Sequence, residues 1–159
     1  MKLSIVIKSQ SDFELILPLC SQIDKIQKEG KYLFYRFLCL CQEETHNTFK
    51  KCLKKYKVNV PYSILEFEDQ ELINNSGVVI EQMRDEIFRN PSESLLMIGR
   101  DDLNISIAAL GSEYKMKILL VDSLDSKKKT KGQFDYIFST TDPECWNQIV
   151  ETIIKIYKL

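Results

Sequence analysis

Short apolar runs, rich in β-branched and aromatic residues, alternate along this chain with longer amphipathic segments. The first run, LSIVI, is apolar at nearly every position, which is typical of a strand buried on both faces of a sheet. The longer segments carry apolar residues at helical spacing. We expect strands at residues 3–7, 32–40, 62–67, 94–99, 117–123 and 135–140. We expect helices at residues 12–30, 43–56, 75–90, 104–115 and 142–159.

Polar residues and prolines indicate where the first and last helices begin. Asp12 is expected to cap the first helix, Pro18 to bend it and Gly30 to end it. Asp142 is expected to cap the last helix, with Pro143 at its first position.

Strands separated by helices favour parallel pairing through right-handed crossovers. The predicted fold is therefore an α/β, doubly wound, Rossmann-like sheet of six parallel strands in the order 3-2-1-4-5-6. No linker, repeat or low-complexity tract divides the 159 residues, so we expect a single domain over residues 1–159.

Charge and cysteine content narrow the functional classes. A net charge of −1 gives no general attraction to nucleic acid or an anionic membrane, and no apolar run is long enough to span a bilayer. An odd number of cysteines predicts reduced, mostly buried thiols in a cytoplasmic protein. Cys39 and Cys41 lack CxxC spacing and His46 is the only histidine, so no metal site is expected. The five cysteines are Cys20, Cys39, Cys41, Cys52 and Cys145.

Ligands of doubly wound sheets bind beyond the carboxyl ends of the strands, near the switch point between strands one and four. Adjacent crossovers leave to opposite faces there and open a crevice. The candidate ligand-binding residues are Ser9, Gln10, Asp12, Gln42, Gly99, Arg100, Ser139 and Thr141. The candidate catalytic residues are the carboxylates Asp101, Asp102 and Asp122.

Each charged candidate also has a structural interpretation. Asp101 and Asp102 suit acid–base work or magnesium binding, but equally the start of a helix. Asp122 suits catalysis or a loop hydrogen bond. Arg100 suits an ion pair with the adjacent aspartates; with a free head it would bind phosphate or carboxylate. In the second case Arg100→Ala would weaken ligand binding and leave the melting temperature nearly unchanged.

Several catalytic motifs are absent from the sequence. No GxGxxG follows the first strand, and no GxxxxGK[ST] or GxSxG occurs, so neither a dinucleotide cofactor nor a P-loop nucleotide is expected. Histidine-dependent catalysis would need His46, which we interpret as a surface residue of a lysine-rich helix. Trp146 is interpreted as a core residue and the lysines of residues 127–131 as solvated.

The loop segments together carry a family resemblance. They are KSQSDFELILPL at 8–19, LCQEETH at 40–46, MIGRDDLNIS at 97–106, MKILLVDSL at 116–124 and FDYIFSTTD at 134–142. In this order they resemble the motifs of the N-terminal half of non-hydrolysing UDP-N-acetylglucosamine 2-epimerases, GT-B-like enzymes of two Rossmann-like domains with the active site between them. Pro18, Leu19 and Gln42 agree with those motifs, and the spacing from Gly99 to Asp122 fits without a gap.

The departures from the family pattern fall on its functional positions. Gln10 stands where the family has arginine, Arg100 where it has an acidic residue, and Asp122 where it has glutamate. The family's P-E-E-x-N-R segment and its second domain have no counterpart. The resemblance implies elimination of UDP across C1–C2 of the sugar and re-addition with inversion, which requires placed carboxylates. We expect a degenerate half domain without epimerase activity that binds a sugar nucleotide, a glycan or a second protein chain, or forms a homo-oligomer.

A second hypothesis is an enzyme of another class. ISIAALGSEYKMKILLV at residues 105–121 also resembles nucleoside deoxyribosyltransferase-like and TIR-like domains, which cleave N-glycosidic bonds. Those domains place a glutamate on this helix, and Glu113 is the candidate. A flavodoxin-like or receiver-like module fits less well, because the early acidic pair of receivers is missing.

Overall fold

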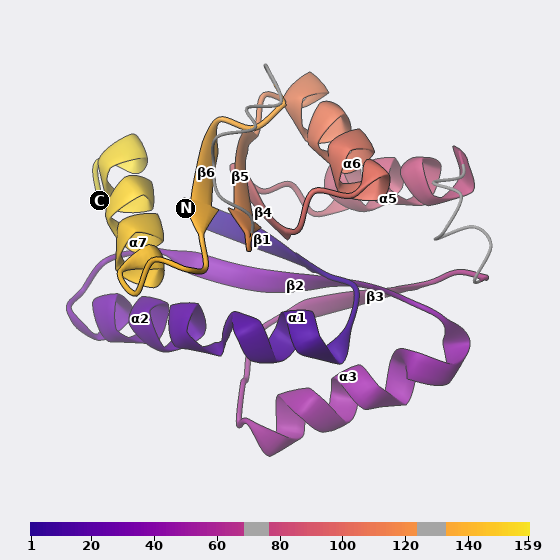
Figure 1. Ribbon diagram of the computed structural model, residues 1–159, viewed down its shortest axis with the longest axis horizontal. Coiled ribbons are helices and arrows are strands. Elements are labelled where there is room, and N and C mark those ends of the chain that lie inside the picture. The colour runs from indigo at the N-terminus through magenta and orange to yellow at the C-terminus, as the bar shows by residue number, and fades with distance from the viewer. Residues whose placement is uncertain (69–76, 124–132) are drawn as a thin grey trace.

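The computed structural model describes residues 1–68, 77–123 and 133–159, and a six-stranded parallel sheet lies at its centre (Figure 1). The strand order is β3-β2-β1-β4-β5-β6, which confirms the predicted fold class and order. The strands are β1 (Lys2–Ile7), β2 (Phe34–Cys41), β3 (Tyr62–Glu66), β4 (Ser94–Ile98), β5 (Lys117–Asp122) and β6 (Tyr136–Ser139).

Helices cover both faces of the sheet. Apolar side chains of α1, α2, α3 and α7 form one buried cluster with the sheet, and those of α5 and α6 form a second cluster on the opposite face (Figure 1). None of the helices in the described part of the chain combines the length and hydropathy of a membrane-spanning segment. The helices are α1 (Gln10–Leu15), α2 (Leu17–Lys28), α3 (Glu43–Lys55), α5 (Gly77–Arg89), α6 (Asp102–Glu113) and α7 (Cys145–Tyr157).

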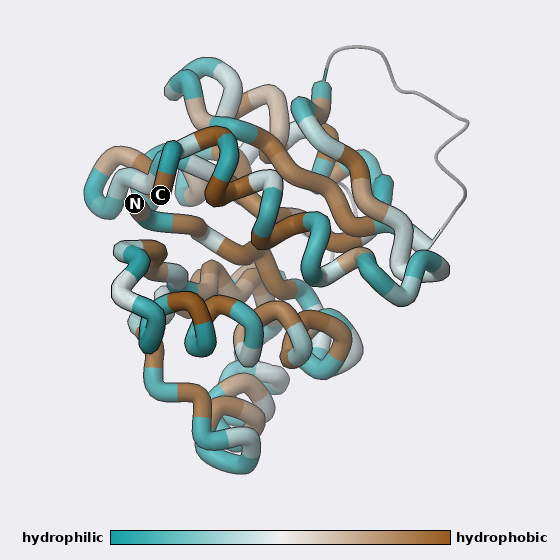
Figure 2. Tube along the Cα trace, turned by 90° about the vertical axis from the view of Figure 1, so that its left-hand side faces the viewer, coloured by the Kyte–Doolittle hydropathy of each residue, from teal (hydrophilic) through white to brown (hydrophobic). Residues whose placement is uncertain are grey.

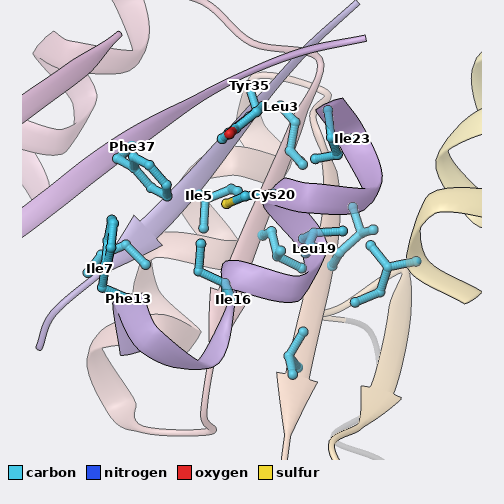
Figure 3. Packing of buried hydrophobic residues seen from close by; sticks show 14 of the residues in the cluster. Leu3, Ile5, Ile7, Phe13, Ile16, Leu19, Cys20, Ile23, Tyr35 and Phe37 are labelled. Carbon is cyan, nitrogen blue, oxygen red and sulfur yellow. The ribbon is translucent and has the colours of Figure 1, made fainter. Parts of the chain in front are cut away.

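The central strand β1 is buried on both faces because its side chains alternate between the two clusters. Leu3, Ile5 and Ile7 point toward α1 and α2, where Phe13 packs with them (Figure 3). Val6 belongs to the cluster under α5 and α6. Figure 2 shows the result along the chain, with hydrophobic strands inside and hydrophilic turns outside.

The five cysteines are free and buried, in agreement with the expectation of reduced thiols. All of them belong to the cluster formed with α1, α2, α3 and α7. Burial raises the pKa of the Cys20 and Cys39 thiols to about 12. Both side chains are therefore protonated at neutral pH and act as apolar core residues. Trp146 is only partly buried, at the margin of the same cluster.

The predicted helix at residues 12–30 is two helices that meet at Ile16. The prediction that Asp12 caps the first of them is wrong. Ser9 is the cap, since its hydroxyl accepts from the Asp12 amide at 3.1 Å. The Asp12 carboxylate instead accepts from the Lys8 amide at 2.9 Å. Pro18 lies in the first turn of α2, where the missing N–H costs no hydrogen bond. The proline thus starts a new helix.

The starts of α6 and α7 also differ from expectation. Helix α6 begins two residues earlier than predicted, at Asp102, because Asp101 caps it. Helix α7 begins at Cys145 rather than at residue 142. Asp142 lies in a turn before α7, where its carboxylate accepts from the amide of Glu144 at 2.9 Å. The Asp–Pro pair therefore forms the preceding turn, which periodicity does not reveal.

One buried arginine joins three strands to α5. Arg36, on β2, donates to the hydroxyl of Ser4 at 2.9 Å, to the carboxylate of Glu86 at 2.8 Å and to the carbonyl of Asn90 at 2.6 Å. Ser63 of β3 also donates to Glu86, at 2.7 Å. The side chains of Arg36 and Glu86 are only 4% and 11% exposed. Burial by itself would raise the pKa of Glu86, but the hydrogen bonds from Ser63, Arg36 and Asn90 lower it below the ordinary value of 4.5.

The lowered pKa of Glu86 links this network to acid stability. Glu86 binds its proton less readily in the folded chain, so its contribution is complete above pH 4.5 and is lost as the pH falls through the folded pKa. We expect Glu86→Gln to lower the free energy of unfolding at neutral pH by about 3 kcal/mol, since it leaves Arg36 buried without its counter-charge. We also expect its stability to fall less steeply than that of the wild type below pH 4.5.

Urea denaturation at neutral and acidic pH measures both effects. The matched control is Glu81→Gln on the same helix, where the side chain is 71% exposed, and its effect should stay below about 0.5 kcal/mol. Equal losses in the two variants would contradict a structural role for the Arg36–Glu86 pair.

Candidate functional site

The predicted site residues lie at the carboxyl edge of the sheet, after neighbouring strands. Ser9 and Asp12 follow β1, and residues 99–102 follow β4. Asp122 ends β5 directly beside Ser139 of β6, its register partner. Gln42 follows β2, on the other side of β1. The strand order thus brings most of the candidates side by side, with β1 and β4 at the switch point.

Asp101 has two roles at this edge. One carboxylate oxygen accepts from the amide of Asn104 at 2.8 Å, which caps α6, and the other forms an ion pair with Lys8. The geometry matches the interpretation of Asp101 as a residue at the start of a helix, rather than one in acid–base work or magnesium binding. The Asp101 side chain is 53% exposed and that of Lys8 is 20% exposed, so solvent reaches the pair. Asp102 follows in the first turn of α6 and is exposed.

Gly99 and Asn104 shape the turn between β4 and α6. Gly99 has a φ of +85°, a backbone conformation that residues with a side chain rarely adopt. The amide nitrogen of Asn104 donates to the carbonyls of Ile98 and Gly99, both at 2.8 Å. Asn104 is 1% exposed, and its side-chain oxygen has no hydrogen-bond partner among the residues that the structure describes. An acceptor without a donor therefore lies at the same end of α6.

Arg100 forms an ion pair with Asp122, with Nε and Oδ2 2.6 Å apart. The two side chains are only 12% and 4% exposed. The expectation of an ion pair is correct, but its partner at this distance is the strand-end aspartate and not an adjacent one. Little of the Arg100 side chain is exposed in this arrangement, and its role in ligand binding stays a prediction.

The candidate residues with hydroxyl or amide side chains form contacts with near neighbours in the sequence. The hydroxyls of Ser139 and Thr141 lie 2.7 Å apart, and Gln10 donates to Glu14 at 2.9 Å on α1.

Burial raises the pKa of Asp12 above its ordinary value. Hydrogen bonding and charge from Lys8 oppose this increase, while the Asp101 carboxylate adds to it. Lys8 therefore lies within reach of two carboxylates.

His46 and Glu113 are the residues on which histidine-dependent catalysis and the N-glycosidase hypothesis depend. Both have partners away from the switch point. His46 contacts the carboxylate of Glu66 through Nδ1, and both side chains are partly exposed. Glu113 pairs with Arg84 at 2.9 Å. It lies at the end of α6 that precedes β5, opposite the carboxyl edge. Ligands of doubly wound sheets bind at the carboxyl edge, so this placement gives the N-glycosidase hypothesis no support.

The expected crevice does not coincide with either of two cavities in the described chain. One cavity, of about 470 Å³, lies at the amino edge of the sheet, with Lys2, Phe34, Pro61 and Glu93 in its wall. The other, of about 490 Å³, lies between α2 and the segment before β3. None of the candidate site residues lines either one. The ion pairs of Lys8 and Arg100 instead cross the strand ends at the carboxyl edge.

Two contributors to this edge, Lys8 and Asn104, are not among the predicted site residues. Lys8 directly follows the first strand, and this position is the available signal, since parallel neighbours end at the same edge. Asn104 lies in the first turn of a helix, where its short amide reaches the preceding turn. The structure groups no three metal-ligating side chains anywhere in the ranges it describes. The lysines of residues 127–131, predicted to be solvated, lie outside the described residues.

Comparison with known proteins identifies the fold. Neither a protein-family model nor a curated protein sequence matches the chain. Among solved structures, the UDP-GlcNAc 2-epimerase of Methanocaldococcus jannaschii superposes with a TM-score of 0.67 at 14% identity, over 97% of this chain and 43% of that one. The UDP-GlcNAc 2-epimerase of Neisseria meningitidis bound to UDP-GlcNAc gives a TM-score of 0.67 at 11% identity, over 97% and 44%. The fold is that of a UDP-GlcNAc 2-epimerase half domain.

The chain thus spans less than half of the length of the epimerases it superposes on. The likeness confirms the predicted resemblance at the level of fold.

The Arg100–Asp122 pair can be tested through stability. Removing either partner leaves the other charge buried, so Arg100→Ala and Asp122→Ala should each lower the free energy of unfolding by about 3–5 kcal/mol. The double variant should lose less than the sum of the two. Urea denaturation measures all three. Arg89→Ala, at an exposed arginine of α5, is the control and should change stability by less than about 0.5 kcal/mol. Additive losses would show that the two side chains do not stabilise each other.

Proposed function

We propose that this chain is a recognition module built on the epimerase-like half domain, which binds a sugar nucleotide, a glycan or a second protein chain at its carboxyl edge and does not catalyse epimerisation. The observation that carries the proposal is the buried ion pair between Arg100 and Asp122. Polar groups from β1, β4, β5 and β6 converge there, as recognition requires, but the innermost carboxylate is already engaged.

The ion pair argues against acid–base catalysis by Asp122. A general base must take up and return a proton during turnover. Oδ2 of Asp122 lies 2.6 Å from Nε of Arg100 and the Asp122 side chain is only 4% exposed, so this carboxylate is not open to a substrate. Asp101 is similarly committed, since its carboxylate caps α6 and pairs with Lys8. Two of the three candidate catalytic carboxylates therefore have structural roles.

The proposal includes a partner at the carboxyl edge. This fold accounts for 43% of the chain of the Methanocaldococcus jannaschii enzyme. We propose that a second protein chain or a second copy of this one covers the carboxyl edge. Light scattering combined with chromatography measures the mass of the purified chain. A partner-free monomer that binds sugars with full affinity would contradict this part of the proposal.

The buried free cysteines support a reducing compartment such as the cytoplasm. This part of the proposal concerns location only and is independent of the ligand.

The catalytic part of the proposal predicts no epimerase activity. Incubated with UDP-N-acetylglucosamine in deuterium oxide, the chain should neither form the manno epimer nor exchange the hydrogen at C2. Loss of one acid–base group alone lowers the rate by about 10²–10⁴-fold. Proton NMR follows both signals. A catalytically active epimerase is the positive control, and a buffer blank sets the background. Turnover clearly above the blank would overturn the proposed function.

A further inference from the structure

The parallel ladder between β2 and β3 stops short of the amino edge of the sheet. Its first register pair is Phe37 with Tyr62, and the amide of Phe37 donates to the carbonyl of Pro61 at 3.1 Å. Strand β2 begins earlier, at Phe34, and over residues 34–36 it is paired in the ladder with β1 alone. The first residues of β2 therefore have a strand on one side only.

Pro61 explains where the ladder stops. In a parallel ladder, every second residue of a strand directs both its N–H and its C=O toward the same neighbouring strand. The amide of Phe34 bonds on the β1 side and that of Phe37 on the β3 side, so Tyr35 directs both of its backbone groups toward the β3 side. The donor opposite the Tyr35 carbonyl would be residue 61, and proline has no N–H.

The backbone of Tyr35 is left without partners at a buried position. No hydrogen bond in the described part of the chain satisfies its N–H or its C=O, and the residue is only 4% exposed. Its ring belongs to the cluster under α2 (Figure 3). Nearly all buried backbone groups in folded proteins are paired, because an unpaired one is costly. Tyr35 thus presents a donor and an acceptor that a ligand can satisfy.

A cavity lies where the ladder is missing. The cavity of about 470 Å³ at the amino edge is lined by Tyr35 and by residues 59–61, and its volume falls within the range of roughly 300–1,000 Å³ that ligand pockets occupy. Val60, Pro61 and the 56% exposed Phe34 give its wall apolar surface. The side chain of Gln27 adds an amide. Apolar walls around an unpaired backbone N–H and C=O suit a main-chain segment with small apolar side chains.

We propose that this cavity binds a short extended peptide, which completes the ladder that Pro61 interrupts. One residue of the peptide donates its N–H to the carbonyl of Tyr35 and accepts from the Tyr35 amide, as opposite residues of paired strands do. Side chains alternate along a strand, so the flanking residues of the peptide lie on the same face as Phe34. The site is at the opposite edge of the sheet from the proposed function and is independent of it.

Two matched probes test the pairing with Tyr35. They are acetylated and amidated valyl-leucyl-valine, and its ester analogue in which oxygen replaces the leucine N–H. In the free ¹⁵N-labelled chain, the Tyr35 amide should exchange its hydrogen faster than the amides of Phe34 and Phe37, which are hydrogen-bonded. The tripeptide should slow this exchange and shift the NMR signals of residues 34–36 and 59–60.

The ester analogue should bind about tenfold more weakly than the tripeptide, because it leaves the Tyr35 carbonyl without a donor. Equal affinity of the two probes would overturn the pairing. A Tyr35 amide whose exchange the tripeptide does not slow would overturn the site.

Pro61→Ala tests the cause of the gap. Alanine supplies the missing N–H, so the ladder should extend to Tyr35, the amide of residue 61 should be protected from exchange, and the affinity for the tripeptide should fall about tenfold or more. Pro143→Ala is the matched control, since it replaces an exposed proline in the turn before α7 and should leave the affinity unchanged.

Phe34→Ala is a second variant that leaves the ladder gap as it is. It removes the aromatic wall of the cavity and should weaken binding of the tripeptide about tenfold. Wild-type affinity in folded Pro61→Ala or in folded Phe34→Ala would overturn the proposal.

Discussion

The structure depends on the burial of β1 on both of its faces. Its residues alternate between two apolar clusters, so helices must cover the sheet above and below it. The strand pairs with β2 on one side and β4 on the other, which makes it the origin of the strand order. The crossovers that begin after β1 and after β4 leave to opposite faces, and the carboxyl edge between them becomes the place where loops meet.

Two nearly buried arginines have different structural roles in this fold. Arg36 lies inside the sheet, where it joins β1 and β2 to α5, and each of its contacts supports the fold. Arg100 lies at the carboxyl edge, where its pair with Asp122 ties the turn after β4 to β5. A buried charge needs a partner in both places. At the edge, the same requirement holds the Asp122 carboxylate against Arg100, and this contact is the basis on which we propose recognition rather than catalysis.

The sequence predicted the elements well where periodicity and burial agree. The runs LSIVI and KILLV became strands, and the strand order followed from their alternation with helices. Helix starts were less predictable, because Ser9 competes with Asp12, and Asp142 favours a turn. Of the site, the sequence placed Gly99, Asp101 and Asp122 at one edge, but not the contact of Lys8 with Asp101 or that of Arg100 with Asp122.

By itself, the sequence determined the fold class, the free and buried state of the cysteines and the set of polar loops, because these depend on local patterns and on the apolar content of each strand. Only the tertiary structure decided which charges neutralise one another. Lys8 and Asp101 are far apart in the chain, and Arg100 has two closer aspartates in sequence than Asp122. Their pairing depends on the parallel register of β4 and β5 and on the positive φ of Gly99, which turns Arg100 over the strand end.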